Sequence, residues 1–467
     1  MSQQAMFNFL GRTASIAPQE LTSPIPEISR PIHYLGSKLR IVDLVREVLD
    51  DVEPTSGTVC DLFAGSGTVS RELSDFRTVI AVDIQEYSRV LCSALLNPTD
   101  VTDGSVERYL QEVRCSDHAQ RLTWAIQPMI DYEVASQRSA QSGEIEPLCH
   151  MLEHGSVVSF QRGSETIEPL PIFSALEQTV FRLRKCGMLD TPAALTTQYF
   201  GGIYFSYIQA SQIDMLLEGV AALPASYRDT FVAAILSTAS EIVNTVGKHF
   251  AQPIRPRFSD GRPKPNLPKR LARDRTVDAI AVFEKWIAKY RTIPHSGRKH
   301  LVVRSDYADA LEGLNGQVSV VYADPPYTRD HYSRFYHVLE TLCLRDCPTV
   351  STVRINGSDR ISRGIYRAER YQSPFCIKSQ APGAFATLFA KVRRLAVPLV
   401  LSYSPFDKSA GAHPRLMGIE QIAQLARKSF RRVEIAAAGK MAHSKLNRSD
   451  KNKALSYGAE KFLICQP

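Results

Sequence analysis

The sequence predicts an α/β fold in which a mostly parallel sheet is interrupted by a long helical insertion. Residues 58–69 form an apolar run, a glycine-containing turn and the start of a helical pattern. Residues 78–83 form a second apolar run that ends in an acid, and similar runs resume after residue 300. Continuous apolar runs closed by Gly, Pro or an acid are typical of buried parallel strands.

Size and composition place the chain among globular proteins. Its 467 residues can form two or three domains, and its 44% hydrophobic and 22% charged residues are ordinary for a soluble protein. No apolar run approaches the roughly 18 residues of a membrane span, and the N-terminus shows no signal-peptide pattern. Nine cysteines without a CxxC pair favour reduced thiols and no metal site. We therefore expect a cytoplasmic protein without membrane contact.

The N-terminal part begins with a polar, proline-containing stretch, residues 1–28, which we expect to form a flexible arm. Apolar residues at three- and four-residue steps from Ile41 to Leu49 then predict a helix. In the strand–turn–helix at residues 58–69, Gly65 and Gly67 let the backbone pass close to a ligand, and the helix begins near Thr68. The absence of Gly-Lys-Ser/Thr excludes a P-loop, and the absence of a third glycine weakens a dinucleotide site.

Asp83 closes the second strand, about 20 residues after the first, where an acid suits the hydroxyls of a ribose. Taken singly, the glycine turn can be only a turn and Asp83 only a helix cap. Their order along the chain nevertheless predicts a site for a nucleoside-containing cofactor.

Residues 100–300 carry mainly helical patterns, including one around Ile213 to Leu217 and another over residues 231–246. Residues 253–269 are rich in proline and arginine, which predicts an extended basic loop with little capacity to form a core. Residues 248–299 hold 14 Lys/Arg against 4 Asp/Glu, and residues 401–467 hold 12 against 5. Two basic segments in an otherwise acidic chain indicate a polyanion partner, and solvated loops are the alternative.

The strand pattern resumes at residues 301–306 and 320–323, followed by a helix over 333–344 and strands near 397–403, 430–435 and 461–464. Two prolines must end the strand before Asp324 and Tyr327. The turn then offers a carboxylate, prolyl carbonyls and a flat ring at the carboxyl end of a strand. A planar amine, such as the exocyclic amino group of a base, would fit these groups. A strand-ending turn with a capping Asp is the alternative.

The chain carries three motifs, at residues 34–38, 61–67 and 324–327. With the motifs in this order, the chain is similar to the Dam-like adenine-specific DNA methyltransferases of the alpha group. The resemblance implies a Rossmann-like class I methyltransferase sheet with helices on both faces and a large, mainly helical inserted target-recognition domain. The implied boundaries are 29–100 and 300–467 for the two parts of the catalytic domain and 101–299 for the insertion.

The resemblance also assigns roles to residues. The S-adenosylmethionine site would contain Tyr34, Lys38, Asp61, Phe63, Gly65, Gly67, Asp83 and Asp306, and the catalytic turn would consist of Asp324, Pro325, Pro326 and Tyr327. From the charge pattern we expect Lys248, Arg255, Arg257, Lys269 and Arg270 to bind DNA.

The expected activity is methylation of the N6 amino group of a flipped-out adenine at a specific site in duplex DNA, in a restriction–modification or related system. A cognate restriction endonuclease is then an expected partner. Methylation of the cytosine N4 amino group commonly uses Ser in place of Asp324, and glutamine methylases typically carry Asn there. A catalytically silent DNA-binding subunit is the alternative outside the enzymes.

Overall fold

The computed structural model describes residues 30–36, 38–163, 170–329, 331–355, 357–403, 415–437 and 460–467. The arm expected over residues 1–28 and much of the basic segment 401–467 lie outside these ranges. The strands are β1 (Val59–Leu62), β2 (Val79–Asp83), β3 (Leu301–Arg304), β4 (Val320–Ala323), β5 (Thr352–Ile355), β6 (Ser358–Ile361), β7 (Leu399–Tyr403), β8 (Arg432–Ala437) and β9 (Lys461–Gln466).

Seven strands form one sheet in the order β3-β2-β1-β4-β7-β9-β8, and β5 and β6 form a separate hairpin. The five strands from β3 to β7 are parallel, whereas β9 runs antiparallel to both β7 and β8. The chain extends from β1 to β2 and β3 on one side and returns to β4 and β7 on the other. Strand order therefore reverses between β1 and β4, where open α/β sheets bind ligands at the carboxyl ends of the strands. The prediction of an α/β fold with a mostly parallel sheet is confirmed.

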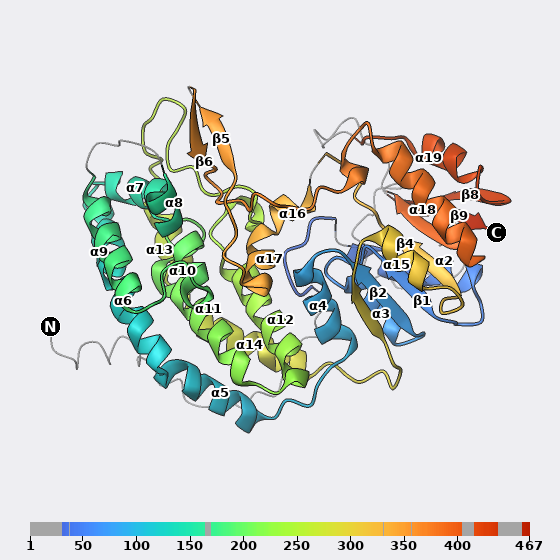
Figure 1. Ribbon diagram of the computed structural model, residues 1–467, viewed down its shortest axis with the longest axis horizontal. Coiled ribbons are helices and arrows are strands. Elements are labelled where there is room, and N and C mark those ends of the chain that lie inside the picture. The colour runs from blue at the N-terminus through green and yellow to red at the C-terminus, as the bar shows by residue number, and fades with distance from the viewer. Residues whose placement is uncertain are drawn as a thin grey trace, which may run out of the picture.

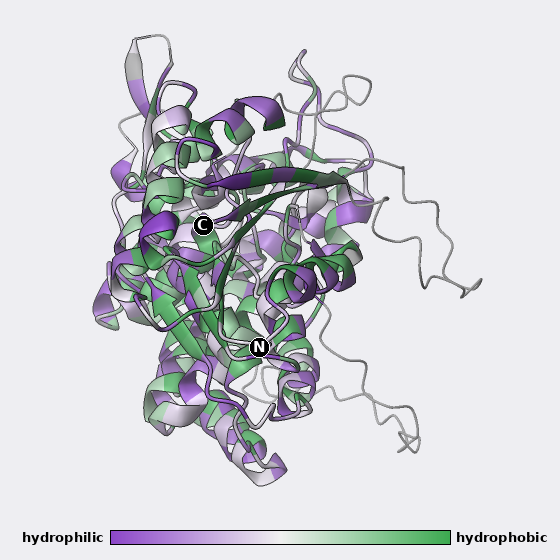
Figure 2. Ribbon diagram, turned by 90° about the vertical axis from the view of Figure 1, so that its right-hand side faces the viewer, coloured by the Kyte–Doolittle hydropathy of each residue, from purple (hydrophilic) through white to green (hydrophobic). Residues whose placement is uncertain are grey.

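Helices cover both faces of this sheet, because successive strand residues alternate between two cores. On one face, Val59 and Val320 pack with α2 (Val42–Val52), α3 (Thr68–Ser74) and α4 (Glu86–Leu96). On the other, Cys60 and Val321 pack with α15 (Tyr307–Gly313), α18 (Ala381–Leu395) and α19 (Ile419–Ala426). The apolar strands accordingly run between the helices (Figure 2).

A body of helices stands beside the sheet (Figure 1). Its helices are α5 (Asp103–Cys115), α6 (Asp117–Gln141), α7 (Glu146–His154), α8 (Val157–Arg162), α9 (Pro171–Lys185), α10 (Leu195–Phe200), α11 (Tyr207–Gly219), α12 (Ala225–Ile242), α13 (Leu267–Asp274), α14 (Ala279–Arg291), α16 (Tyr332–Phe335) and α17 (His337–Leu344). Short 3-10 turns are η1 (Lys38–Arg40), η2 (Pro192–Ala194), η3 (Val220–Ala222), η4 (Val246–Lys248) and η5 (Pro374–Cys376). Within the described ranges, no helix combines the length and apolar character needed to cross a bilayer.

Helix α4 joins the helical body to the sheet, because its two sides belong to different cores. Leu91 packs with α12 and α17 in the core of the helical body, whereas Leu96 packs with the sheet. The segment before η1 also crosses this boundary: the His33 N–H donates to Ser240 Oγ of α12, and Tyr34 stacks on Tyr336 with ring centroids 5.0 Å apart. The groups that follow β1, β2 and β4 are thereby held against the helical body.

Two expectations about local structure were wrong. The helix expected over residues 333–344 is broken at Tyr336, which separates α16 from α17. The segment 253–269 is not an extended loop without a core, because Ile254 and Leu267 are buried against Leu148 and Leu152 of α7. Those apolar partners lie more than 100 residues away in the sequence, so local composition could not reveal them.

Candidate active site

The turn after β1 carries backbone strain that fixes its shape. Phe63 has a φ of 71°, Gly65 57° and Gly67 75°. The N–H groups of Phe63 and Ala64 both donate to the carbonyl of Val82, which ties the turn to β2. Non-glycine residues rarely adopt positive φ, and they persist there when the surrounding structure holds them.

The two glycines of this turn make room for different neighbours. A Cβ on Gly65 would lie 2.5 Å from the Tyr34 hydroxyl, so Gly65 allows the tyrosine ring to close over the turn. A Cβ on Gly67 would lie 2.9 Å from a methyl of Leu95, so Gly67 lets α3 approach α4. Of the two predicted glycines, only Gly65 lines the cavity described below.

Asp83, the last residue of β2, holds the turn by hydrogen bonds. One carboxylate oxygen accepts from Gly65 N–H at 2.9 Å and the other from Gln85 N–H at 2.9 Å. Burial raises the pKa of Asp83, although these hydrogen bonds oppose the rise. A carboxylate has about four acceptor positions, so these two bonds leave capacity for a ligand hydroxyl.

The end of β3 supplies a second carboxylate at the cavity. Asp306 caps α15 by accepting from Ala308 N–H at 2.8 Å, and its other oxygen accepts from the Tyr371 hydroxyl at 2.9 Å. The neighbouring Tyr307 ring packs 5.6 Å from that of Phe63. Asp306 and Tyr371 thus lie together on the cavity wall, on segments 65 residues apart.

At the end of β4, Asp324 forms an ion pair that continues to the last strand. Lys38 Nζ lies 3.1 Å from Asp324 Oδ1 and 2.9 Å from Glu460 Oε1. Ser402 of β7 donates a hydrogen bond to the same Glu460 oxygen. Burial would lower the pKa of Lys38, but Asp324, Tyr327 and Glu460 raise it well above its usual range. Lys38 therefore remains a cation between two carboxylates.

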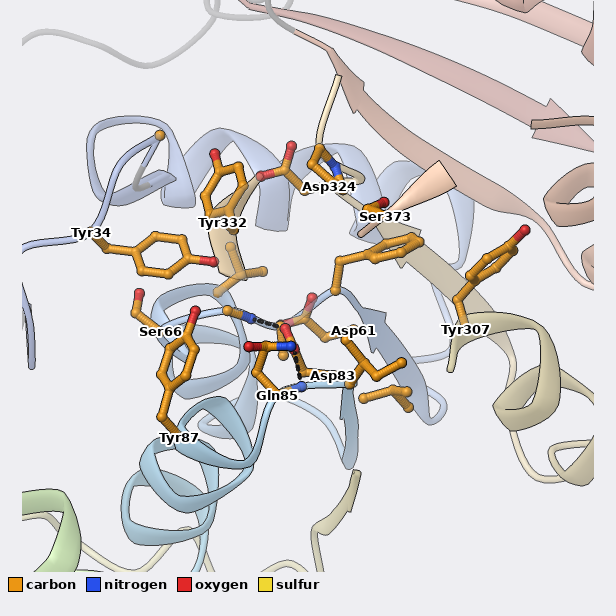
Figure 3. Close-up of a pocket in the computed structure, with 18 of the residues that line it drawn as sticks. Tyr34, Asp61, Ser66, Asp83, Gln85, Tyr87, Tyr307, Asp324, Tyr332 and Ser373 are labelled. Carbon is orange, nitrogen blue, oxygen red and sulfur yellow. Dashed lines mark hydrogen bonds between the residues drawn. The ribbon is translucent and has the colours of Figure 1, made fainter. Parts of the chain in front are cut away.

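One cavity joins these groups (Figure 3). Asp61 and Asp83 lie at its base, Asp324 lies above them, and Tyr34 and Tyr332 form one wall. The predicted site residues that line it are Tyr34, Lys38, Asp61, Phe63, Gly65, Asp83, Asp306, Asp324 and Pro326. The other predicted residues of these motifs, Gly67, Pro325 and Tyr327, do not line it.

The environment of Tyr327 explains its separation from the cavity. The guanidinium of Arg415 lies over its ring, 4.5 Å from the centroid, and the ring of Tyr403 lies 4.9 Å away. Tyr332 instead lines the cavity, five residues further along the chain.

Sequence reasoning missed several lining residues, among them Tyr87, Tyr332, Ser333 and Tyr371. The aromatic residues that follow Tyr327 were a usable signal, because a tyrosine soon after the turn must remain near it. Glu460 gave no signal, since it lies 422 residues from Lys38 and only strand pairing brings the two together.

The match to known families agrees with this geometry. Residues 34–123 match the model of the D12 class N6 adenine-specific DNA methyltransferases, a range that includes the Tyr34–Lys38 motif, the glycine turn and Asp83. The matched range covers less than half of the chain. It confirms the resemblance drawn from the motifs, and the family that it matches implies DNA adenine-N6 methyltransferase activity with S-adenosylmethionine as the methyl donor. No curated protein matches the chain significantly.

The cavity is rich in carboxylates. Its charged lining residues are Asp61, Asp83, Asp306, Asp324 and Lys38. Burial raises the pKa of Asp61 to about 7, with the hydrogen bond from Ser70 opposing the rise and other acids adding to it. Such a cavity favours cationic groups, and the sulfonium and ammonium of S-adenosylmethionine are cations.

We expect methyl transfer to slow in mild acid. Burial raises the pKa of Asp324 to about 6, Lys38 lowers it and Glu460 raises it. If the ionised carboxylate accepts from the target amine, the single-turnover rate should fall as pH drops through about 6. Glu460→Gln removes a negative charge and should move this acid limb to lower pH, whereas Lys38→Met should move it to higher pH. An acid limb that stays fixed in both variants would contradict the assignment.

The basic residues predicted to bind DNA differ in how far other residues of the chain already neutralise their charge. Arg257 forms ion pairs with Glu146 and Glu153 at 2.8 and 3.0 Å. Lys248 and Arg270 donate to backbone carbonyls of Val243 and Thr245. Arg255 and Lys269 are exposed, and neither forms an ion pair within the described ranges. The last two are therefore the members of the predicted set that are best placed to meet phosphate.

Proposed function

We propose that this chain methylates the N6 amino group of an adenine at a specific site in duplex DNA, and that the adenine is flipped out of the helix for the reaction. The observation that carries the proposal is that one cavity contains Asp324 together with Asp83, which holds the glycine turn, and Asp306, which follows β3. Asp324, a carboxylate suited to accept from a base amine, thus lies beside Asp83 and Asp306, two carboxylates suited to a nucleoside.

The cavity residues fit S-adenosylmethionine. Asp83 retains acceptor positions suited to ribose hydroxyls, and Asp306 is an acceptor suited to an adenine amino group. Ser333 lines the cavity, and its hydroxyl is buried without a hydrogen-bond partner among the described residues. A buried hydroxyl of this kind normally requires a partner, which a bound ligand would provide.

In the proposed mechanism, the residues after β4 prepare the amine. Asp324 and the carbonyl of Pro325 accept its two N–H bonds, which favours the tetrahedral form in which the nitrogen lone pair is available. Lys38 keeps Asp324 ionised, because its positive charge lowers the pKa of that carboxyl. S-adenosylmethionine supplies the electrophilic methyl group, and positioning accounts for much of the acceleration. No enzyme nucleophile is needed.

An adenine within a duplex cannot reach Asp324, so the proposal requires base flipping. Tyr327 was the expected stacking platform, and its ring already carries Arg415 on one face. Tyr332 lies on the cavity wall beside Asp324, and we add it as a second candidate for stacking on the base (Figure 3).

We assign target recognition to the inserted helices over residues 101–299, with residues 29–100 and 300–467 as the catalytic domain. Support comes from the basic segment 248–299 and from the contact of α12 with α4, which holds the inserted helices against the sheet. The proposed place in a restriction–modification system, with a cognate restriction endonuclease, rests on the resemblance to the family alone.

The direct test is to express the chain in a host without adenine methylation and to sequence the modified bases in its DNA. We expect N6-methyladenine in one sequence motif, and none when Asp324→Ala is expressed at the same level. Modification of cytosine N4 would instead support the closest alternative enzyme. Binding of S-adenosylmethionine without modification of any base would support a catalytically silent subunit.

A further inference from the structure

Four arginines lie near one another around Tyr366. Arg255, Arg334, Arg363 and Arg370 are here called the arginine cluster. Within the described ranges, none of the four forms an ion pair with a carboxylate, whereas the nearby Arg367 binds Asp346 through both its terminal nitrogens at 2.7 and 2.6 Å. The cluster therefore holds positive charge that the protein does not neutralise.

A buried tyrosine organises two of these arginines. The guanidinium carbons of Arg334 and Arg370 lie 4.8 and 5.3 Å from the centre of the Tyr366 ring. The ring is itself held in place, because its hydroxyl donates to the Ala251 carbonyl and His337 packs against it at 4.9 Å. Arginines on an aromatic ring keep their planar N–H edges available to a bidentate acceptor.

The other two arginines add charge beside this platform. Arg363 donates to the Ile254 carbonyl, and its Nε is buried without a hydrogen-bond partner among the described residues. Burial lowers the pKa of Arg363, and the neighbouring charge of Arg255 lowers it further. The nearby Glu153, which opposes this shift, is already bound by Arg257 at 3.0 Å.

Two members of the cluster, Arg334 and Arg370, lie at the rim of the cavity. Arg334 directly follows the cavity residues Tyr332 and Ser333, and Arg370 directly precedes the cavity residue Tyr371. The segment that carries Arg363 and Arg370 crosses from the β5–β6 hairpin towards the sheet (Figure 1). Any nucleotide that inserts its base beside Asp324 must leave its own phosphates outside the cavity, near this rim.

We propose that the arginine cluster is a phosphate-binding site for the DNA backbone that flanks the flipped nucleotide. This inference rests on the proposed function and adds to it a site outside the residues predicted from the sequence. Phosphate offers fork-shaped acceptors to guanidinium groups, and its charge relieves the mutual repulsion of Arg334 and Arg370. The site should act on every DNA sequence alike, since phosphates carry no base information.

The test compares two double variants by their duplex-DNA affinity over a series of salt concentrations. Arg334→Gln/Arg370→Gln removes the two charges over Tyr366. The control, Arg108→Gln/Arg431→Gln, removes two exposed charges elsewhere. Arg108 lies on α5, which Figure 1 shows at the end of the helical body opposite the β5–β6 hairpin. Arg431 precedes β8, which runs parallel to β7, so it lies at the amino edge of the sheet, opposite Asp324.

Each phosphate contact contributes about −0.9 to the slope of log affinity against log salt. The cluster variant should therefore show a slope shallower by up to about 2 and a loss of affinity of about tenfold or more at low salt, equal for different duplex sequences. The control should match wild type in both quantities, and calorimetric binding of S-adenosylmethionine should be unchanged in all three proteins. If the double variant fails to fold, Arg334→Gln alone tests the site, because Arg334 is exposed. We then expect a change in the salt slope of up to about 1.

Three outcomes would overturn the inference: an unchanged slope and affinity in the cluster variant, an equal loss in the control, or wild-type duplex binding that does not depend on salt. A wild-type protein that binds duplex DNA with the expected slope but methylates no base would contradict the proposed function instead. Because binding and methyl transfer are measured separately, the two failures can be told apart.

Discussion

Replacing Asp324 with alanine should abolish methyl transfer while S-adenosylmethionine still binds. The carboxylate is the charged acceptor at the end of β4, and loss of one well-placed polar contact in an active site costs roughly 10²–10³-fold in rate. Since Asp324 would hold both the amine and its orientation, we expect at least that loss. The fold should survive, because Lys38 keeps Glu460 as a partner at 2.9 Å and no buried cation is left unpaired.

The rate should be measured in a single turnover with saturating DNA, and cofactor binding by calorimetry. Asp51→Ala is a suitable control, because this acid is exposed on α2 and forms no ion pair among the described residues. Activity of the Asp324 variant within tenfold of wild type would disprove its assignment as the acceptor of the amine.

Replacing Gly65 with valine should reduce binding of S-adenosylmethionine below detection. The new Cβ would lie 2.5 Å from the Tyr34 hydroxyl, and Tyr34 cannot easily move because it stacks on Tyr336. Gly65 also has a φ of 57°, a conformation that costs a side-chain-bearing residue roughly 1–3 kcal/mol. Both effects would displace the turn that lines the base of the cavity.

Calorimetry, with far-UV circular dichroism as the check on folding, measures this effect. Gly104→Val is the matched control, because a Cβ at Gly104 meets no atom within 4 Å and its φ is not positive. A folded Gly65→Val protein with wild-type affinity would show that the glycine serves only the path of the backbone.

The strands and the order of the motifs could be predicted because each depends on residues that are close together in the sequence. Buried parallel strands require continuous apolar runs, and residues such as Pro325 or Gly65 must end them. All seven strands of the sheet lie near their predicted positions, and the predicted site residues Tyr34, Lys38, Asp83, Asp306 and Asp324 line one cavity. Once strands are parallel, their carboxyl ends share one edge, so residues placed there converge.

Side-chain partners between distant segments could not be predicted. Arg257 was expected to meet DNA, yet Glu146 and Glu153 neutralise it within the protein. The segment 253–269 was expected to lack a core, yet Leu148 and Leu152 supply one. Neither set of contacts could be predicted, because composition reports the charge and hydropathy of a segment but not of the surface that it contacts.

By itself, the sequence determined the sheet, the resemblance to the family and the acidic residue at the end of each central strand. Only the tertiary structure decided that Glu460 shares Lys38 with Asp324 and that Arg334 and Arg370 meet over Tyr366. The physical reason is that a strand or a turn depends on neighbours within a few residues. Ion pairs and ring contacts instead depend on which faces the whole chain brings together when its apolar surface is buried.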